Sequence, residues 1–286
     1  MRVGRVVELW RYPVKSMRGE QLEACRVEQR VGIPGDRSWA LRDERAGEIR
    51  GAKKIPRLLE LAARALEEPV GEAVPSVEIE LPDGRVVISD DPQASKLISR
   101  AVGREVTLEA RRPPTDLAHY RRARRIEDVE GVIRAASELL PDEPVPEFDE
   151  FPAELLEFVS PPGTYFDGFE LHLLTKASLA ELSRRAPGTR IDARRFRPNL
   201  VIETSGTTPA FPEFEWCGRR LRIGDLQVEV VSPMIRCGMT HHAQADLPKQ
   251  PDIMRALVRE TDMTLGVGAS VVTAGAVRLG DSIEIL

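Results

Sequence analysis

The chain has 286 residues, of which 42% are hydrophobic and 30% are charged. This length suits an enzyme with one or two cored domains. The formal net charge of −5 argues against nucleic acid as the main partner, and no apolar stretch reaches the length that spans a membrane. The three cysteines are odd in number and far apart, which argues against a disulfide framework and favours the cytoplasm.

The N-terminal third reads as short strands. Alternating apolar residues and turn signals predict a hairpin around Pro82-Asp83-Gly84. A helix should follow, capped by Asp90 or Asp91 and ended by Gly103. Extended segments are expected at residues 3–12, 21–29, 36–43, 77–81 and 86–88.

The stretch 111–150 is the least regular, and we interpret it as a solvated connection with one helix near residues 129–140, rather than as a docking surface. Beyond it, strands are expected at 171–174 and 199–203, as a hairpin at 219–223 and 226–231, and as a pair at 268–273 and 276–285; helices are expected at 175–186 and 251–260. Strands outnumber helices and do not alternate with them. The sequence therefore predicts a mainly β fold with flanking helices (α+β) and a barrel-like sheet.

Cys237 is the residue with the clearest chemical signature. It follows the strand-like segment 226–231 and lies between Arg236 and Gly238, a setting in which a thiol is accessible and favoured as thiolate. Such a cysteine suits a soft metal ligand or a nucleophile. Two basic motifs, at 12–16 and 195–199, suit the binding of an anion.

Several motifs appear in an order that is more specific than any one of them. The N-terminal part carries Tyr12-Pro13-Val14-Lys15-Ser16, Gly35-Asp36-Arg37-Ser38-Trp39 and Pro56-Arg57-Leu58. The C-terminal part carries Leu173-Leu174-Thr175, Phe196-Arg197-Pro198-Asn199-Leu200, Leu221-Arg222-Ile223-Gly224, Arg236-Cys237 and Gly280-Asp281. This set resembles the MOSC superfamily, in the subgroup with an N-terminal β-barrel domain that includes the mitochondrial amidoxime-reducing component. The resemblance implies an N-terminal β-barrel domain at 1–115, a connecting segment at 116–150 and a MOSC-type β-barrel at 151–286.

The same resemblance implies a molybdenum cofactor, Mo-molybdopterin, with the Cys237 thiolate as the catalytic metal ligand. A soft sulfur ligand fits that chemistry. By resemblance, the pterin and its phosphate are held by Lys15, Ser16, Arg37, Arg197 and Asn199, with polar contacts from Thr175 and Arg236. One departure concerns Ile235, which stands where relatives often have a small hydroxyl residue.

The function implied is reduction of small N-hydroxylated compounds to an amine or amidine plus water. The alternative is a non-catalytic MOSC protein that binds or delivers the cofactor or its sulfur. We expect a separate electron-transfer protein, of ferredoxin or cytochrome type with its reductase, because Cys25 and Cys217 are too few for an iron–sulfur cluster. The basic run 121–125 is a candidate landing site for it. No nucleic acid and no membrane is expected as a partner.

His241 and His242 also invite a zinc interpretation. No second cysteine is nearby and the spacing matches no common zinc motif, so we favour simple exposure, ahead of lining a substrate pocket and ahead of metal ligation. Asp246 lies in the same loop and is a candidate pocket residue. Cys25 and Cys217 are expected to be ordinary small hydrophobic residues.

Overall fold

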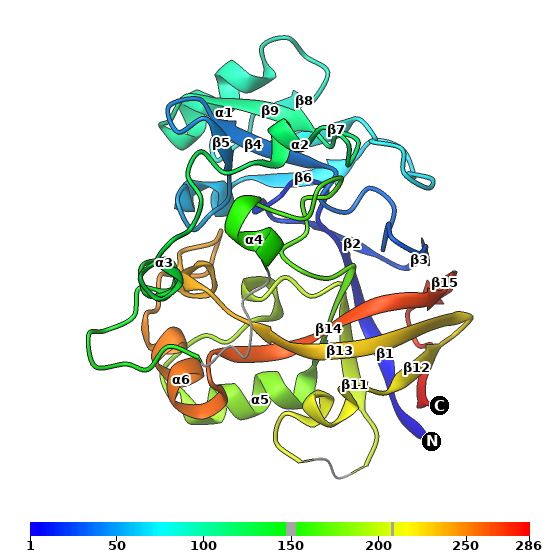
Figure 1. The fold of residues 1–286 in the computed structure, drawn as a ribbon. Coiled ribbons are helices and arrows are strands. Elements are labelled where there is room, and N and C mark those ends of the chain that lie inside the picture. Colours follow the sequence, from blue (N-terminus) through cyan, green and yellow to red (C-terminus); the bar gives the residue numbers. More distant parts are fainter. Residues whose placement is uncertain (147–152, 207–208) are drawn as a thin grey trace.

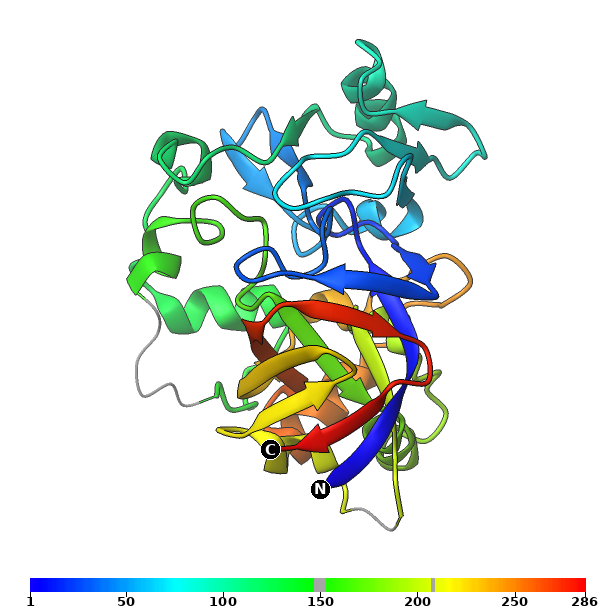
Figure 2. The same ribbon diagram turned by 90° about the vertical axis from the view of Figure 1, so that its right-hand side faces the viewer.

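A closed barrel of seven strands forms the main body of the molecule. The computed structural model describes residues 1–146, 153–206 and 209–286. Around the barrel the order is β11 (Leu200–Thr204), β10 (Leu171–Thr175), β14 (Thr264–Thr273), β13 (Leu226–Ile235), β12 (Arg220–Ile223), β16 (Ser282–Ile285) and β1 (Arg2–Arg11), and the pairing of β1 with β11 closes it. The two chain ends lie side by side (Figures 1 and 2). The predicted α+β fold with a barrel is confirmed.

The interior of the barrel is apolar because side chains alternate in direction along each strand. On β13, Leu226, Val228 and Val230 are buried, whereas Glu229 is exposed. Leu9 and Leu173 are fully buried in the same core. Each such side chain contributes about 1.5–3 kcal/mol of hydrophobic stabilisation.

Two helices cover one side of the barrel. Helix α5 (Lys176–Arg185) packs on β10 and β11, and α6 (Asp252–Thr261) packs on β14 and on α5. Leu182 and Leu257 are buried between them. Thr175 caps α5 through its hydroxyl, which accepts from Ser178 N, as the sequence predicts.

The upper part of the molecule in Figure 1 is built from two small sheets. One has the order β5 (Glu48–Arg50), β4 (Trp39–Asp43), β9 (Val106–Ala110), and the other β6 (Ala62–Ala65), β7 (Val77–Glu80), β8 (Val86–Ile88). Helix α1 (Ala94–Val102) and the short helix η1 (Pro56–Glu60) complete a separate apolar core around Leu58 and Ile79. The predicted hairpin of β7 and β8 is confirmed.

The connecting segment contains α2 (Leu117–Tyr120) and α3 (Val129–Ser137), and α4 (Ala153–Glu157) follows it. Helix α3 begins where predicted but ends three residues early, at Glu138 in a left-handed conformation with φ 50°. The predicted boundary between residues 150 and 151 lies outside the described residues. Strand β1 lies in the barrel, although it belongs to the segment assigned by sequence to the first domain. The predicted limits stay a prediction.

Three details of the sequence-based elements are wrong. The segments 268–273 and 276–285 do not pair with each other, because both edges of β14 are already occupied by β10 and β13. Instead, β15 (Gly275–Arg278) pairs with β3 (Ala24–Val27), and β16 joins β1 to β12. The extended segment 21–29 is two strands, β2 (Glu20–Leu22) and β3. Gln93 occupies the N-cap position of helix α1 without a capping hydrogen bond from its side chain, and the Asp91 carboxylate accepts from Gln93 N instead.

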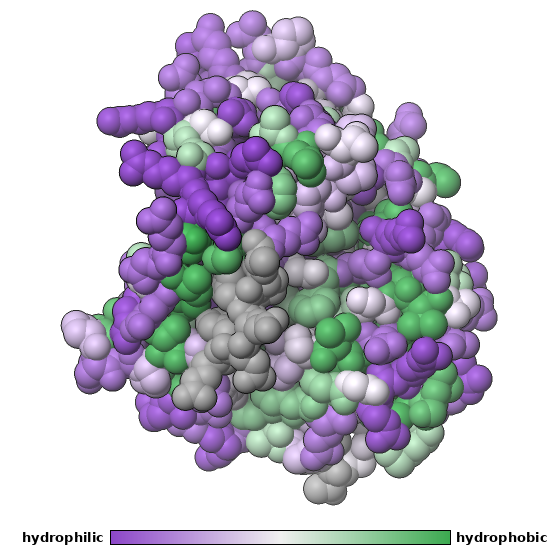
Figure 3. All heavy atoms as spheres, in the orientation of Figure 1, coloured by the Kyte–Doolittle hydropathy of each residue, from purple (hydrophilic) through white to green (hydrophobic). Residues whose placement is uncertain are grey.

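No helix in the described ranges is both long and apolar enough to cross a bilayer. The face drawn in Figure 3 is mainly hydrophilic over the upper part and carries separate hydrophobic patches over the barrel. Scattered apolar residues of this kind are normal on protein surfaces.

Candidate functional site

Four segments that are far apart in the sequence meet beside the end of β1. Arg37 N donates to Tyr12 O (2.7 Å) and Lys15 N donates to Trp39 O (2.8 Å), so the loop after β1 pairs with the approach to β4. Trp10 N donates to Asn199 O (2.9 Å), which joins β1 to the start of β11. These backbone contacts bring both predicted anion motifs to one place.

Tyr12 lies beneath two guanidinium groups. The Cζ atoms of Arg197 and Arg37 are 4.1 Å and 5.2 Å from the centre of its ring. The phenol donates to Pro198 O at 3.0 Å, and burial raises its pKa, so the ring is a neutral platform. Cation–π attraction of about 0.5–2 kcal/mol partly offsets the repulsion between the two arginines.

Asp36 organises the same group of side chains from below. Its carboxylate accepts from Tyr12 N (2.6 Å), from Asn199 Nδ2 (3.2 Å) and from Arg37 Nη1. Asn199 Oδ1 in turn accepts from His172 N at 3.1 Å. Asp36 and Asn199 therefore fix the orientation of Arg37 and connect three segments of the barrel.

Lys15 is a buried cation whose amine is held by two acceptors. Its Nζ donates to Tyr165 O (2.7 Å) and to Asp167 Oδ1 (2.6 Å). Desolvation lowers the pKa of Lys15, while the Asp167 charge opposes this. Desolvation likewise raises the pKa of Asp167, but the charges of Lys15 and Lys53 outweigh it and hold that pKa below its usual value. Asp167 is 63% exposed, so this ion pair faces solvent on one side.

Arg236, directly before Cys237, reaches back to the segment before β11. Its Nη2 donates to Phe196 O (2.8 Å), and its Nη1 is 3.5 Å from His172 Nε2. Burial lowers the pKa of His172 well below its usual value, and the charge of Arg236 adds to the effect, so His172 is neutral. A glycine is required opposite it, since a Cβ at Gly266 would lie 2.3 Å from His172 Nε2 and Gly266 has φ 70°.

Three of the predicted site residues adopt a left-handed backbone that is unusual for residues other than glycine. Ser16, Arg37 and Arg197 have φ of 68°, 49° and 55°. Each such residue costs of order 1–3 kcal/mol, and such conformations gather at binding and active sites. Two of them carry the guanidinium groups that flank Tyr12.

The charges around Tyr12 do not balance. Lys15, Arg37, Arg197 and Arg236 face the two carboxylates of Asp36 and Asp167, which leaves two positive charges in excess. Burial, reinforced by the Arg37 charge, lowers the pKa of Arg197 to about 10. Arg197 Nη2 and Arg236 Nε are buried without a hydrogen-bond partner among the described residues. Excess buried charge with unused donors fits a bound dianion such as a phosphate.

Cys237 is a half-buried free thiol at the start of the short helix η4 (Gly238–His241). The Cys237 charge raises the pKa of Arg236 against the larger lowering by desolvation, so the two side chains interact electrostatically. Cys25 and Cys217 differ, because desolvation raises the pKa of both thiols, to about 12 for Cys25. Both pack against the barrel core, which confirms the prediction for them.

Ser16 and Thr175 make other contacts. Ser16 Oγ accepts from Ala52 N at 3.0 Å. Thr175 Oγ1 donates to Glu213 Oε2 (2.6 Å) within a fully buried cluster that also holds Ser178. The structure thus joins Lys15, Arg37, Arg197, Asn199 and Arg236 into one network, which we call the cation cluster, and uses Thr175 to start α5. A role for Ser16 and Thr175 toward a cofactor stays a prediction.

Sequence reasoning missed Asp167 and His172. His172 has a detectable signal, since it is the one polar residue in the apolar run 171–174. Asp167 stands in a loop with no motif, and its pairing with Lys15 spans 152 positions of the chain. Two surface hollows of about 490 and 450 Å³ are lined by other residues than the cation cluster. Charge and unused donors, rather than cavity size, make the cluster the candidate ligand site.

The loop after Cys237 is held by Arg195, which is 1% exposed. Its guanidinium donates to the carbonyls of Thr240 (3.3 Å), His242 (3.1 Å) and Pro248 (2.8 Å). The expectation that the two histidines are exposed is wrong: His241 is 0% and His242 7% exposed. Their neighbours in sequence gave no sign of the buried arginine that draws this loop inward.

Two family models match this chain. Residues 163–284 match the model of the MOSC domain, and residues 3–99 match the MOSC N-terminal beta barrel domain. The chain belongs to the MOSC family. Its Cys237 and the Arg197 segment lie in the MOSC domain, and Lys15 and Arg37 lie in the N-terminal domain.

This MOSC protein is similar to curated proteins at low identity. It is 26% identical over 256 residues to mitochondrial amidoxime-reducing component 1 of Homo sapiens and 29% identical over 251 residues to mitochondrial amidoxime reducing component 2 of Rattus norvegicus. Each match covers 83% of this chain but 66% of the relative's length. The relationship is therefore distant and spans about two thirds of those proteins.

Two solved structures were compared with this MOSC protein. The YuaD protein of Bacillus subtilis matches 99% of this chain and 95% of its own, with 14% identity and a TM-score of 0.45. YiiM of Geobacillus stearothermophilus matches 41% of this chain and 54% of its own, with 20% identity and a TM-score of 0.33.

Proposed function

We propose that this MOSC protein is a molybdenum-cofactor-dependent oxidoreductase that reduces small N-hydroxylated compounds. The observation that carries the proposal is the buried cation cluster with two excess positive charges and unused donors on Arg197 and Arg236, next to the free thiol of Cys237. A phosphate-bearing cofactor that also needs a sulfur ligand satisfies both features.

In this proposal Arg197 and Arg236 hold the cofactor's phosphate through the donors that lack a protein partner. Lys15 contributes a third cation: it releases its ion pair with the solvent-facing Asp167 and binds the anion instead. Tyr12 keeps the guanidinium of Arg197 in place from below. Asp36 and Asn199 do not touch the anion but orient the donors. Charge-assisted hydrogen bonds of this kind are worth about 1.5–3 kcal/mol each.

Cys237 is the proposed thiolate ligand to molybdenum, and its thiol is free and half-buried. When bound, the cofactor supplies the two-electron chemistry that cleaves the N–O bond, giving an amine or amidine and, with two protons, water. Neutral His172 accepts toward Arg236 Nη1 and so keeps that arginine beside the thiol. No side chain is assigned as the proton donor.

The similarity to the amidoxime-reducing components supports the choice of N-hydroxylated substrates. The alternative is a MOSC protein that carries the cofactor or its sulfur without turnover. Both need the same cation cluster and the same thiol, so binding alone does not separate them.

Turnover separates the two functions. The test is to produce the protein in a host that makes the cofactor, with added molybdate, and to assay a panel of N-hydroxy compounds with reduced viologen as donor. We expect about one molybdenum per chain. The loaded protein should reduce N-hydroxy compounds, and the cofactor-free protein should not. Full loading without turnover of any compound in the panel would favour the carrier.

The proposal extends to a separate electron-transfer protein as partner. The sequence has three cysteines, fewer than the four thiolates of a common iron–sulfur cluster. The basic run 121–125 contributes to an exposed face, although Arg121 is paired with Glu157 at 2.8 Å. An acidic ferredoxin or cytochrome is the matching kind of partner.

A further inference from the structure

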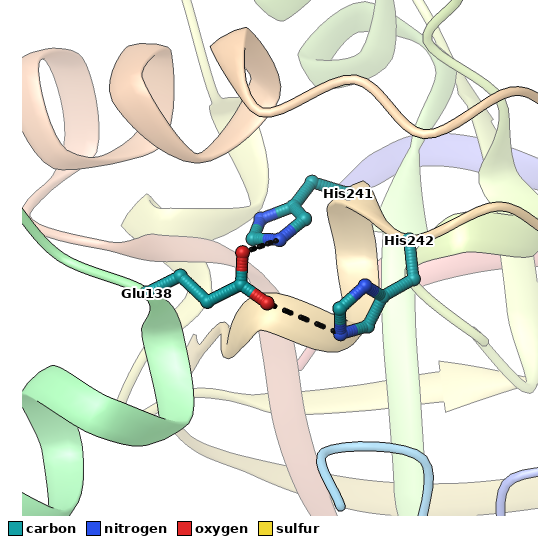
Figure 4. Close-up of side chains that lie close together, drawn as sticks. All are labelled: Glu138, His241 and His242. Carbon is teal, nitrogen blue, oxygen red and sulfur yellow. Dashed lines mark hydrogen bonds and ion pairs between the residues drawn. The ribbon is translucent and has the colours of Figure 1, made fainter. Parts of the chain in front are cut away.

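Glu138, His241 and His242 form a compact group outside the cation cluster (Figure 4). His241 Nε2 is 3.1 Å from Glu138 Oε2, and His242 Nε2 is 3.7 Å from Glu138 Oε1. One ligand atom from each residue lies within 4.8 Å of the other two. Both imidazoles therefore point at the same carboxylate from adjacent positions of one loop.

These distances suit a metal ion placed between the three groups. Zinc lies about 2.0–2.2 Å from nitrogen and oxygen ligands in tetrahedral sites, which sets neighbouring ligand atoms about 3.3–3.5 Å apart. The two histidine nitrogens lie 3.1 and 3.7 Å from the two different oxygens of Glu138, and one ligand atom from each of the three residues lies within 4.8 Å of the other two. Binding of one ion requires the three side chains to close around it from these positions.

The chain holds these ligands in place before any ion binds. His241 and His242 are 0% and 7% exposed, and Arg195 fixes the His242 carbonyl. Glu138 ends α3 with φ 50°, a conformation that strains a glutamate.

We propose that Glu138, His241 and His242 bind a transition-metal dication, with zinc as the best match to two imidazoles and one carboxylate. Water completes the coordination, since the Glu138 side chain is 45% exposed. Lys249 is the competitor: its Nζ is 3.2 Å from Glu138 Oε2, and its side chain is 49% exposed. Metal binding requires Lys249 to move into solvent.

Such a site has a structural consequence next to the proposed catalytic cysteine. It ties the end of α3, in the connecting segment, to η4, which begins one residue after Cys237. Zinc would therefore stiffen the loop that carries Cys237. The site is independent of the molybdenum cofactor, because it shares no residue with the cation cluster.

The test is a zinc titration of the metal-stripped full chain by calorimetry, with the visible spectrum of cobalt(II) as a second readout of tetrahedral geometry. We expect one zinc per chain. Glu138→Gln and His242→Ala should each weaken binding at least tenfold, because each removes one of three ligands. Lys249→Gln should bind zinc several-fold more tightly.

Cys237→Ser is the matched control, since a thiol is the other strong zinc ligand nearby, and its zinc affinity should be unchanged. Circular dichroism confirms folding; Glu138 is an exposed position whose variant keeps the shape of the side chain. Absence of zinc binding by the unsubstituted chain would overturn the proposal. Binding that survives Glu138→Gln and His242→Ala, or that is lost in Cys237→Ser, would overturn it as well.

Discussion

Replacing Arg197 by methionine should separate two effects of this buried charge: its effect on folding stability and its contribution to anion binding. Methionine has a similar length and no charge. The substitution removes one buried cation that forms no ion pair within the described ranges and that the charge of Arg37 disfavours. If the cluster exists to bind an anion, the ligand-free protein should tolerate the loss of this charge.

The magnitude follows from the pKa of Arg197, which burial lowers from its usual value to about 10. A shift of that size corresponds to ~3 kcal/mol of unfavourable free energy for the charged form in the folded protein. Against this, the variant loses the hydrogen bond to Met17 O and the cation–π contact with Tyr12, together worth about 2–5 kcal/mol. The two effects largely cancel, so the stability without ligand should change by about 2 kcal/mol or less.

Arg195 provides the matched control, because it is a neighbouring buried arginine whose donors are all used. Its three nitrogens donate to five acceptors, among them the carbonyls of Thr240, His242 and Pro248. Arg195→Met leaves these acceptors unpaired and should destabilise the fold by several kcal/mol. Both arginines are buried, but Arg197 keeps a donor without a partner among the described residues, whereas the donors of Arg195 are used.

The assay is urea unfolding of cofactor-free protein, with and without inorganic phosphate as the anion probe. A ligand that binds the folded state raises stability by RT ln(1 + [L]/Kd). Phosphate should stabilise the unsubstituted chain and Arg195→Met but not Arg197→Met. A loss of 3 kcal/mol or more in Arg197→Met, with the phosphate effect retained, would show that Arg197 is structural and refute the reasoning.

Three further outcomes are expected. Cys237→Ala should lose molybdenum or leave it inactive, whereas Cys25→Ala should keep normal metal content; full metal and unchanged activity in the first variant would exclude it as a ligand. Burial raises the pKa of Glu213, so the folded state binds the carboxyl proton more tightly than the unfolded state does. The resulting contribution to folding stability is full below the usual pKa of 4.5 and falls as the pH rises through the raised pKa. The difference in folding stability between Glu213→Gln and the unsubstituted chain should therefore shift in favour of the variant from pH 4 to pH 8. A difference that is the same at both pH values would contradict this. Loaded protein with NADH or NADPH should reduce an N-hydroxy substrate only after a ferredoxin and its reductase are added; turnover with the nicotinamide alone would remove the need for a partner.

The strands of the barrel were predictable because apolar alternation and turn residues are local signals. Residues 3–12 and 226–231 show that pattern plainly, and both are strands. The pairing of the last strands was not predictable in the same way. Which edge of β14 is free depends on β10 and β13, and no property of residues 268–285 reports that.

The candidate site likewise contains residues that the sequence predicts and residues that only the folded chain reveals. Lys15, Arg37, Arg197 and Arg236 lie in motifs, and the structure brings them together. Asp167 has no motif, because its place depends on a loop that meets Lys15 only in the folded chain. Glu138 was missed as a partner of His241 for that reason too: 103 positions separate them. Sequence spacing detects ligands that one segment supplies, and misses those that folding adds.

The location of the strain explains why the cation cluster sits where it does. Arg37 and Arg197 adopt left-handed backbone conformations at the approaches to β4 and β11, and those strands are anchored by pairing with β9 and β10. A loop alone would relax, moving the guanidinium groups apart and into water. The barrel and the upper sheet instead hold two mutually repelling arginines over one tyrosine ring. In the proposed function, an arriving anion relieves this repulsion, and the rigid neighbours keep the donors in position for it.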